Sequence, residues 1–168
     1  MPMTSTDVLS IIQHLEVPHL FVSADGGWGV DALLGEQTRP HDDLDLVVDF
    51  EEIDAVNEAM ALLGFQPWIN EMPTRFVLKS PGDRRIDFHP MHFDDTGYAH
   101  QQLPGGKLFT CRIDALHGAG RIADREVPCL TVELQLAVHI GYEPTATDQR
   151  DIQRLCDRFG LSPSEGYK

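Results

Sequence analysis

The residues best suited to chemistry form one short stretch, Asp43-Leu44-Asp45. Side chains alternate between the two faces of a β-strand, so Asp43 and Asp45 are expected to share a face opposite Leu44. Two neighbouring carboxylates repel each other, and a divalent cation that prefers oxygen ligands, such as Mg²⁺, relieves this repulsion. Acidic pairs also occur where a strand begins at the surface, so the pair alone leaves both interpretations open.

A glycine pair, Gly26-Gly27, precedes these acids in the chain. Glycines between a strand and a helix let the backbone approach a phosphate closely, and the first N–H groups of the helix then face the anion. Such a pair also serves as an ordinary turn. In this order, however, a phosphate-binding turn and a metal-binding acid pair are what phosphoryl transfer requires, since that reaction depends on positioning and charge neutralisation.

Asp87 is the third candidate ligand, because it is an acid within an otherwise apolar strand. If its strand lies beside that of Asp45, Asp87 completes a site for two magnesium ions. It can then also accept the proton of an attacking hydroxyl group. The alternative is an ion pair with Arg84 or Arg85.

Hydrophobic periodicity and turn residues predict a mixed sheet with helices packed on it, an α/β (α+β) fold with C-terminal helices. The predicted helices cover residues 6–15, 28–34, 51–63, 131–140 and 147–159, with caps at Ser5 or Thr6, at Thr131 and at Thr147. The predicted strands cover residues 19–24, 44–50, 65–69, 75–78, 84–88, 108–111 and 126–129. Residues 90–106 are rich in Gly, Pro, His and Asp and predict a loop.

The overall composition is that of a soluble globular protein of 168 residues, with 42% hydrophobic and 24% charged residues. We expect one domain, with a catalytic core over 1–112 and a smaller, mainly helical region over 113–168. The net charge of −14 and the lack of a basic tract argue against a nucleic-acid partner. No signal peptide or membrane-length apolar run is visible, which predicts a cytoplasmic protein with three reduced cysteines.

Two motifs resemble antibiotic nucleotidyltransferases of the DNA polymerase β-like superfamily: DGGWGVDALLG from Asp25 and TRPHDDLD from Thr38. The resemblance is strongest to the small lincosamide nucleotidyltransferases and extends to the aminoglycoside 2″-nucleotidyltransferases. It continues through IDFHP from Ile86, VPCLT from Val127 and HIGYE from His139, and so covers nearly the whole chain.

The resemblance implies a polymerase β-like nucleotidyltransferase fold and a set of site residues. The implied catalytic residues, which are also the implied metal ligands, are Asp43, Asp45 and Asp87. The implied nucleotide-binding residues are Gly26, Gly27, Trp28, Arg39 and His41. The implied cofactors are two Mg²⁺ ions, with a nucleoside triphosphate, ATP, as co-substrate.

Several of these residues have structural alternatives. Arg39 can bind a phosphate through paired N–H donors or form an ion pair with an acid. His41 is expected to order its loop by hydrogen bonding rather than to bind metal. Asp148 and Asp151 match a family pattern, yet acids at a helix start also serve as caps. His139, with Tyr142, is expected to be a hydrogen-bonded core residue, and zinc binding by the histidines at 89 and 92 is not expected.

The implied activity is transfer of a nucleoside monophosphate to a hydroxyl group of a small molecule, with a lincosamide as the first expectation. Alternatives are an aminoglycoside or other small metabolite as acceptor, or a toxin–antitoxin-type enzyme that modifies a protein or RNA. A non-catalytic nucleotide-binding relative is a third possibility, against which the complete set of acids argues. A homodimer is a further expectation, since the acceptor in this superfamily sometimes lies across a dimer.

Overall fold

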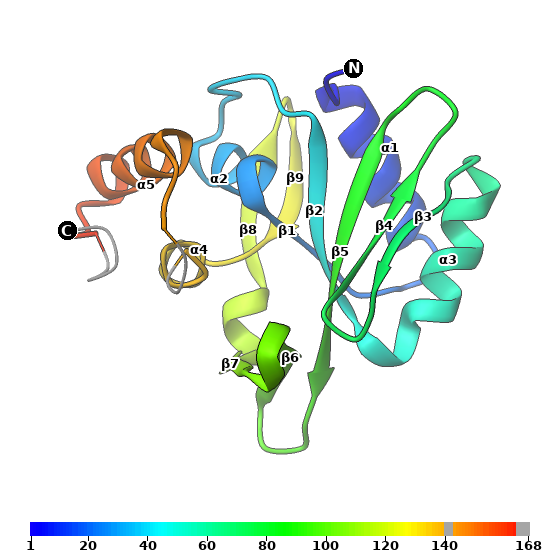
Figure 1. The fold of residues 1–168 in the computed structure, drawn as a ribbon. Coiled ribbons are helices and arrows are strands. Elements are labelled where there is room, and N and C mark those ends of the chain that lie inside the picture. Colours follow the sequence, from blue (N-terminus) through cyan, green and yellow to red (C-terminus); the bar gives the residue numbers. More distant parts are fainter. Residues whose placement is uncertain (140–142, 164–168) are drawn as a thin grey trace.

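A nine-stranded sheet runs through the computed structural model, which describes residues 1–139 and 143–163 (Figure 1). Its strands are β1 Val22–Asp25, β2 Asp43–Asp49, β3 Gln66–Glu71, β4 Arg75–Lys79, β5 Arg85–Phe93, β6 Tyr98–Gln102, β7 Leu108–Arg112, β8 Gly118–Ile122 and β9 Arg125–Cys129. The main strand order is β3-β4-β5-β2-β1-β9-β8, and β6 and β7 extend from the far end of β5. The pairs β2–β5 and β1–β9 are parallel and the other pairs are antiparallel, so the expected mixed sheet is confirmed.

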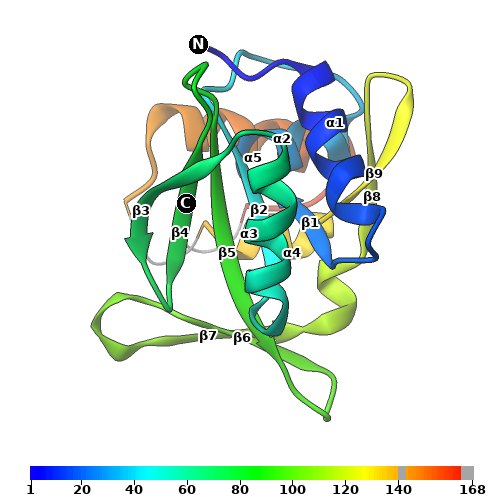
Figure 2. The same cartoon turned by 90° about the vertical axis from the view of Figure 1, so that its right-hand side faces the viewer.

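Helices cover both sides of this sheet. They are α1 Ser5–Glu16, α2 Gly26–Leu34, α3 Ile53–Leu62, α4 Val132–Ala137 and α5 Ala146–Phe159, with short 3₁₀ turns at Phe50–Glu52, Pro104–Gly106 and Ile113–Leu116. Figure 2 shows α1 and α3 together on one face, while α4 and α5 lie on the opposite side. None of the helices in the described ranges is both long and apolar enough to cross a bilayer.

Strand alternation decides which side chains face which layer. Leu44 and Leu46 of β2, with Ile86 and Phe88 of β5, are fully buried in the core that α1 and α3 close. Because alternate residues point to opposite faces, the acids of β2 and β5 point to the other side of the sheet, toward α4 and α5. The face assignment predicted for the Asp43-Leu44-Asp45 stretch is therefore confirmed.

The loop predicted over residues 90–106 is wrong. Strand β5 continues through Pro90 to Phe93, and β6 pairs with it and with β7. Pairing of β4 with β5 ends at Phe88, so at Pro90 one side of the strand has no partner and a missing N–H is tolerated. The proline and the nearby polar residues obscured the pattern of the β5 extension and of β6, the strand that lines one end of the cavity described below.

Strand β8 was also missed, and glycine is the reason. Gly118 and Gly120 suggest a turn, yet both are needed for close packing. A Cβ atom on Gly120 would lie 2.5 Å from the backbone of Ala32, and one on Gly118 would lie 2.7 Å from the Cys129 carbonyl oxygen. Both β8 and β9 belong to the segment 113–168, so the expected division at residue 112 does not coincide with an edge of the sheet.

Helix starts differ from the expected ones by a few residues. Thr4 caps α1 and Thr145 caps α5, each in a capping box with the acid three residues later, whereas Thr131 caps α4 as predicted. Helix α2 begins at Gly26 rather than at Trp28, with the Asp25 side chain as its cap. The expected helix end at 140 and the residue at 142 lie outside the described residues.

Candidate active site

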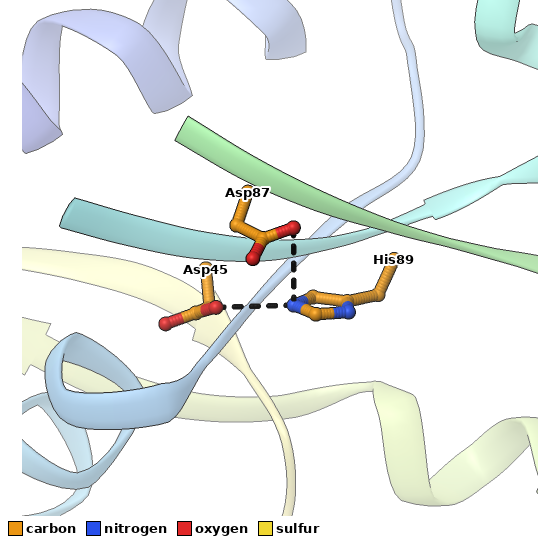
Figure 3. Close-up of side chains that lie close together, drawn as sticks. All are labelled: Asp45, Asp87 and His89. Atoms are coloured by element: carbon orange, nitrogen blue, oxygen red, sulfur yellow. Dashed lines mark hydrogen bonds and ion pairs between the residues drawn. The ribbon is translucent and has the colours of Figure 1, made fainter. Parts of the chain in front are cut away.

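Three carboxylates stand in a row across neighbouring strands. Asp25 of β1 is in register with Asp45 of β2, and Asp45 is in register with Asp87 of β5. The ligand atoms of Asp45, Asp87 and His89 all lie within 4.8 Å of one another. Figure 3 shows the two carboxylates and the imidazole ring converging on one point. The structure thus brings Asp87 beside Asp45, as the metal-site prediction requires.

His89 was not expected in this cluster. Its Nε2 atom lies 3.0 Å from Asp45 Oδ1 and 3.9 Å from Asp87 Oδ1 (Figure 3). Burial opposes protonation of the ring, but the hydrogen bond to Asp45 and the charges of Asp45, Asp25 and Asp87 raise its pKa to about 9. The alternation that places Asp87 on this face also places His89 there, so the sequence did contain the signal.

Asp43 precedes Asp45 on the same face and lines the same cavity, but it is not one of the three converging groups. Burial raises the pKa of Asp43 to about 6, and the charges of Asp45 and Asp87 add to this effect. Burial also raises the pKa of Asp87. Asp43, Asp45 and Asp87 therefore form a site of excess negative charge, which a divalent cation would neutralise.

One atom of Asp87 is left for a ligand. Its Oδ2 atom accepts a hydrogen bond from Arg75, which also donates to Glu71 at 2.8 Å. Its buried Oδ1 atom has no hydrogen-bond partner in the part of the chain that the structure describes. Asp87 does not form the ion pair that was considered with Arg84 or Arg85. It pairs instead with Arg75 of β4. The Oδ1 atom of Asp87 and the carboxylate of Asp45 together offer oxygen ligands that fit a hard cation such as Mg²⁺.

Both glycines of the turn are required by close contacts. Gly26 has φ +60°, and a Cβ atom there would overlap the carboxylate of Asp45. A Cβ atom on Gly27 would overlap the ring of His41 and would lie 2.8 Å from Arg39 Nη2. The glycine pair therefore lets the start of α2 lie directly against Asp45 and the loop before β2.

Trp28 lies away from the cavity. Its side chain is 1% exposed within the core, and its ring centroid is 4.8 Å from that of His41. His41 is also buried and hydrogen-bonds through Nε2 to Asp31 of α2, so it orders the loop before β2 as expected. A nucleotide-binding role for Trp28 is consequently limited to its main-chain N–H group.

Arg39 forms the ion pair that was considered as its alternative role. Its Nη2 atom lies 2.8 Å from Asp151 Oδ2, and its Nε atom donates to Asp151 Oδ1 at 3.4 Å. Asp151 is buried on α5, whereas Asp148 completes the capping box of that helix. The pair ties the loop before β2 to the last helix, and Arg39 still lines the cavity.

A cavity of about 650 Å³ connects these groups. Its walls come from Asp25, Asp43 and Asp45, the start of α2, the end of β6, the residues that follow α4, and helix α5, whereas Asp87 is not among the lining residues. Its lining residues include Asp25, Gly26, Gly27, Arg39, His41, Asp43, Asp45, Arg85, His89, Gln101, Leu103, His139, Asp148 and Asp151. His139 donates through Nδ1 to the Gln135 carbonyl oxygen at 2.7 Å, which agrees with its expected hydrogen-bonded role.

Sequence comparisons identify relatives of this chain. The family model described as aminoglycoside-2″-adenylyltransferase matches residues 7–155. A lincosamide resistance protein of Staphylococcus haemolyticus is 34% identical over 148 residues, which are 88% of this chain and 89% of that protein. A 2″-aminoglycoside nucleotidyltransferase of Klebsiella pneumoniae is 34% identical over 104 residues, which are 62% of this chain and 54% of that protein.

Solved structures agree with these matches. The lincomycin-bound lincosamide antibiotic adenylyltransferase LnuA superposes with a TM-score of 0.81 at 32% identity, covering 92% of this chain and 98% of that one. ANT(2″)-Ia in complex with adenylyl-2″-tobramycin gives a TM-score of 0.70 at 22% identity, over 93% and 89% of the two chains, which supports the fold. The expected polymerase β-like nucleotidyltransferase fold is confirmed. The chain belongs to the aminoglycoside-2″-adenylyltransferase family.

Proposed function

We propose that this protein transfers AMP from ATP to a hydroxyl group of a lincosamide, with Mg²⁺ held by Asp43, Asp45 and Asp87. The observation that carries the proposal is the register of β2 and β5, which puts Asp87 beside Asp45, with one Asp87 oxygen that accepts no hydrogen bond from any described residue. Such a site supplies what nucleotidyl transfer needs, namely fixed negative ligands for a cation beside a turn that can receive phosphates.

Each residue has a distinct part in the proposed reaction. Bound Mg²⁺ would neutralise the phosphates and lower the pKa of the acceptor hydroxyl group. We assign acceptance of the hydroxyl proton to the Asp87 carboxylate, which would lie beside both the cation and the acceptor. The acceptor oxygen bonds to the α-phosphorus as the bond to the pyrophosphate oxygen breaks. Pyrophosphate then leaves with that electron pair.

The start of α2 provides the phosphate-binding part of the proposed site. The Gly26 N–H group donates to Asp25 Oδ1 at 2.6 Å, so the N–H groups of the residues that follow it are those available to phosphate oxygens. Arg39 lies on the same wall, but its guanidinium group is already held by Asp151. We therefore assign Arg39 to positioning the loop and leave phosphate binding to the helix start.

The lincosamide class is preferred because similarity to the lincosamide resistance protein covers most of both chains. Similarity to the aminoglycoside enzymes covers about half of those proteins. One observation favours an aminoglycoside as a second candidate: aspartates outnumber arginines in the lining of the cavity, and the protein carries a net charge of −14. Such a surface attracts a polycationic acceptor.

A single assay tests both acceptors. Purified protein is incubated with ATP, Mg²⁺ and a panel of lincosamides and aminoglycosides, and the mass of each acceptor is then measured by mass spectrometry. We expect a gain of one AMP on lincosamides, and no gain when EDTA removes the cation. Transfer of radiolabel from ATP into protein or RNA, with no small acceptor modified, would instead support the toxin–antitoxin alternative. No transfer to any acceptor would support the non-catalytic one.

A further inference from the structure

Gln135 on α4 is a fully buried polar side chain that the proposed reaction does not use. Its Nε2 atom donates to Asp25 Oδ1 at 3.2 Å, whereas its Oε1 atom has no hydrogen-bond partner among the described residues. The reverse orientation of the amide would place Oε1 against a carboxylate oxygen. An unpaired buried oxygen is destabilising, and an apolar residue here would avoid this effect. The side chain therefore has a role other than packing.

The partner of Gln135 is the residue from which the glycine turn starts. Asp25 caps α2, and its Oδ1 atom accepts hydrogen bonds from both Gly26 N–H and Gln135 Nε2. Asp25 is also in register with Asp45 and lines the cavity. The Gly26 N–H group is next to Asp25 in the chain and moves with the turn. Gln135 lies on another element, so it provides the contact that fixes the Asp25 carboxylate.

The packing around Gln135 leaves its amide little freedom. A Cβ atom on Gly29 would lie 2.8 Å from Gln135 Oε1 and 2.8 Å from the Ala24 carbonyl oxygen, so α4 can approach the first turn of α2 only across a glycine. The backbone N–H of Leu130 donates to the same Ala24 oxygen at 3.1 Å and ties the segment before α4 to the end of β1. The amide is thereby held over Asp25.

We propose that Gln135 is a positioning residue for nucleotidyl transfer, which through Asp25 holds the Gly26-Gly27 turn in the conformation that receives the triphosphate. The inference rests on the proposed function. Without the amide, the hydrogen bond from Gly26, its own neighbour in the chain, is the one that the Asp25 carboxylate keeps among the described residues. The helix start then loses its fixed orientation, so catalysis with ATP should suffer while recognition of the acceptor should not.

The test is a double-mutant cycle with Gln135→Met and Asp25→Ala. Methionine keeps the length and volume of glutamine and removes the donor. We expect Gln135→Met to lower kcat/KM for ATP about tenfold, as for a lost hydrogen bond to a charged group, with the KM for the acceptor unchanged. The double variant should be no worse than Asp25→Ala alone, because Gln135 acts through Asp25. Thermal melting of every variant checks the fold.

Gln153→Leu is the matched control, since Gln153 Nε2 donates to Asp157 at 2.7 Å on the exposed side of α5, and it should leave kcat/KM unchanged. The inference is wrong if Gln135→Met matches the wild type, if its effect multiplies with that of Asp25→Ala, or if the KM for the acceptor rises equally. Should Gln135→Met fail to fold, a normal kcat/KM for ATP in Asp25→Ala would overturn it. Wild-type protein that modifies no acceptor would refute the proposed function itself.

Discussion

At the scale of single residues, Asp45 lies between the acids of the two neighbouring strands. It lies in register with Asp25 and Asp87, hydrogen-bonds His89 and packs against Gly26. Its negative charge is repelled by the other acids and attracted by the imidazolium of His89. This position suits the proposed role of Asp45 as a ligand of a cation that Asp87 also binds.

Asp45→Asn should therefore separate function from stability. We expect transfer to fall by at least about a thousandfold, because a lost metal ligand removes several kcal/mol of transition-state stabilisation. In the absence of metal, the free energy of unfolding should change by less than about 1 kcal/mol, since the loss of repulsion between Asp45 and the neighbouring acids offsets the weakened contact to His89. Steady-state kinetics and urea unfolding measure the two quantities. Near-normal turnover would show that Asp45 is not a ligand.

Alternation along two strands was enough to predict that the side chains of Asp43 and Asp45 share one face, but not which residues contact these acids. The Asp87 partner, Arg75, and the Asp25 partner, Gln135, depend on which elements come together in three dimensions. Gln135 is 110 positions from Asp25, and no local pattern connects the two. His89 is different, because it follows Asp87 by two positions and strand alternation puts it on the same face, although it was not predicted to join the acids.

At the scale of elements, α2 is fixed to the sheet both by buried side chains such as Trp28 and by close contact between backbones. Gly120 of β8 lets the helix backbone at Ala32 approach directly. The sequence suggested α2, β1 and β2 because their apolar patterns are regular. It did not suggest β8, in which small residues take the place of the usual β-branched ones. Strand β5 was likewise cut short, because Pro90 normally ends a strand.

Gly120→Val should displace α2 and the turn at its start. The added side chain overlaps Ala32, which we expect to lower the free energy of unfolding by about 1–3 kcal/mol and to lower activity as well. Gly82→Ala is the control, because Gly82 has an ordinary φ and its new Cβ atom would come no closer than 3.9 Å to Ser80 Oγ. Equal stability of the two variants would contradict this view of the packing.

The turn between β5 and β6 should make stability depend on acid pH. Asp94 accepts hydrogen bonds from His100, Tyr98 and Thr96, which hold its pKa below the usual value. For a lowered carboxyl pKa, the stabilisation is complete above the unfolded-state value near 3.8 and is lost as the pH falls below it. Thermal melting between pH 7 and pH 3 should show a smaller decrease for Asp94→Asn than for the wild type. Identical profiles would rule out this contribution.

At the scale of the whole molecule, the oligomeric state and the cytoplasmic location stay predictions. For the homodimer, light scattering coupled to size-exclusion chromatography should give about twice the mass of one chain, which is 18.8 kDa. Measurements with and without ATP and an acceptor would show whether ligands change the assembly. A mass of a single chain under all conditions would exclude the dimer.

The ion pair between Arg39 and Asp151 has a consequence for how the protein matures in the cell. Asp151 leaves the ribosome after the acids of β2 and β5, because it follows them in the chain. A nascent chain can therefore assemble its sheet while one wall of the cavity is still missing. A premature stop codon before α5 would leave every proposed metal ligand in place but would remove Asp151, so the shortened product should lack the proposed transfer activity.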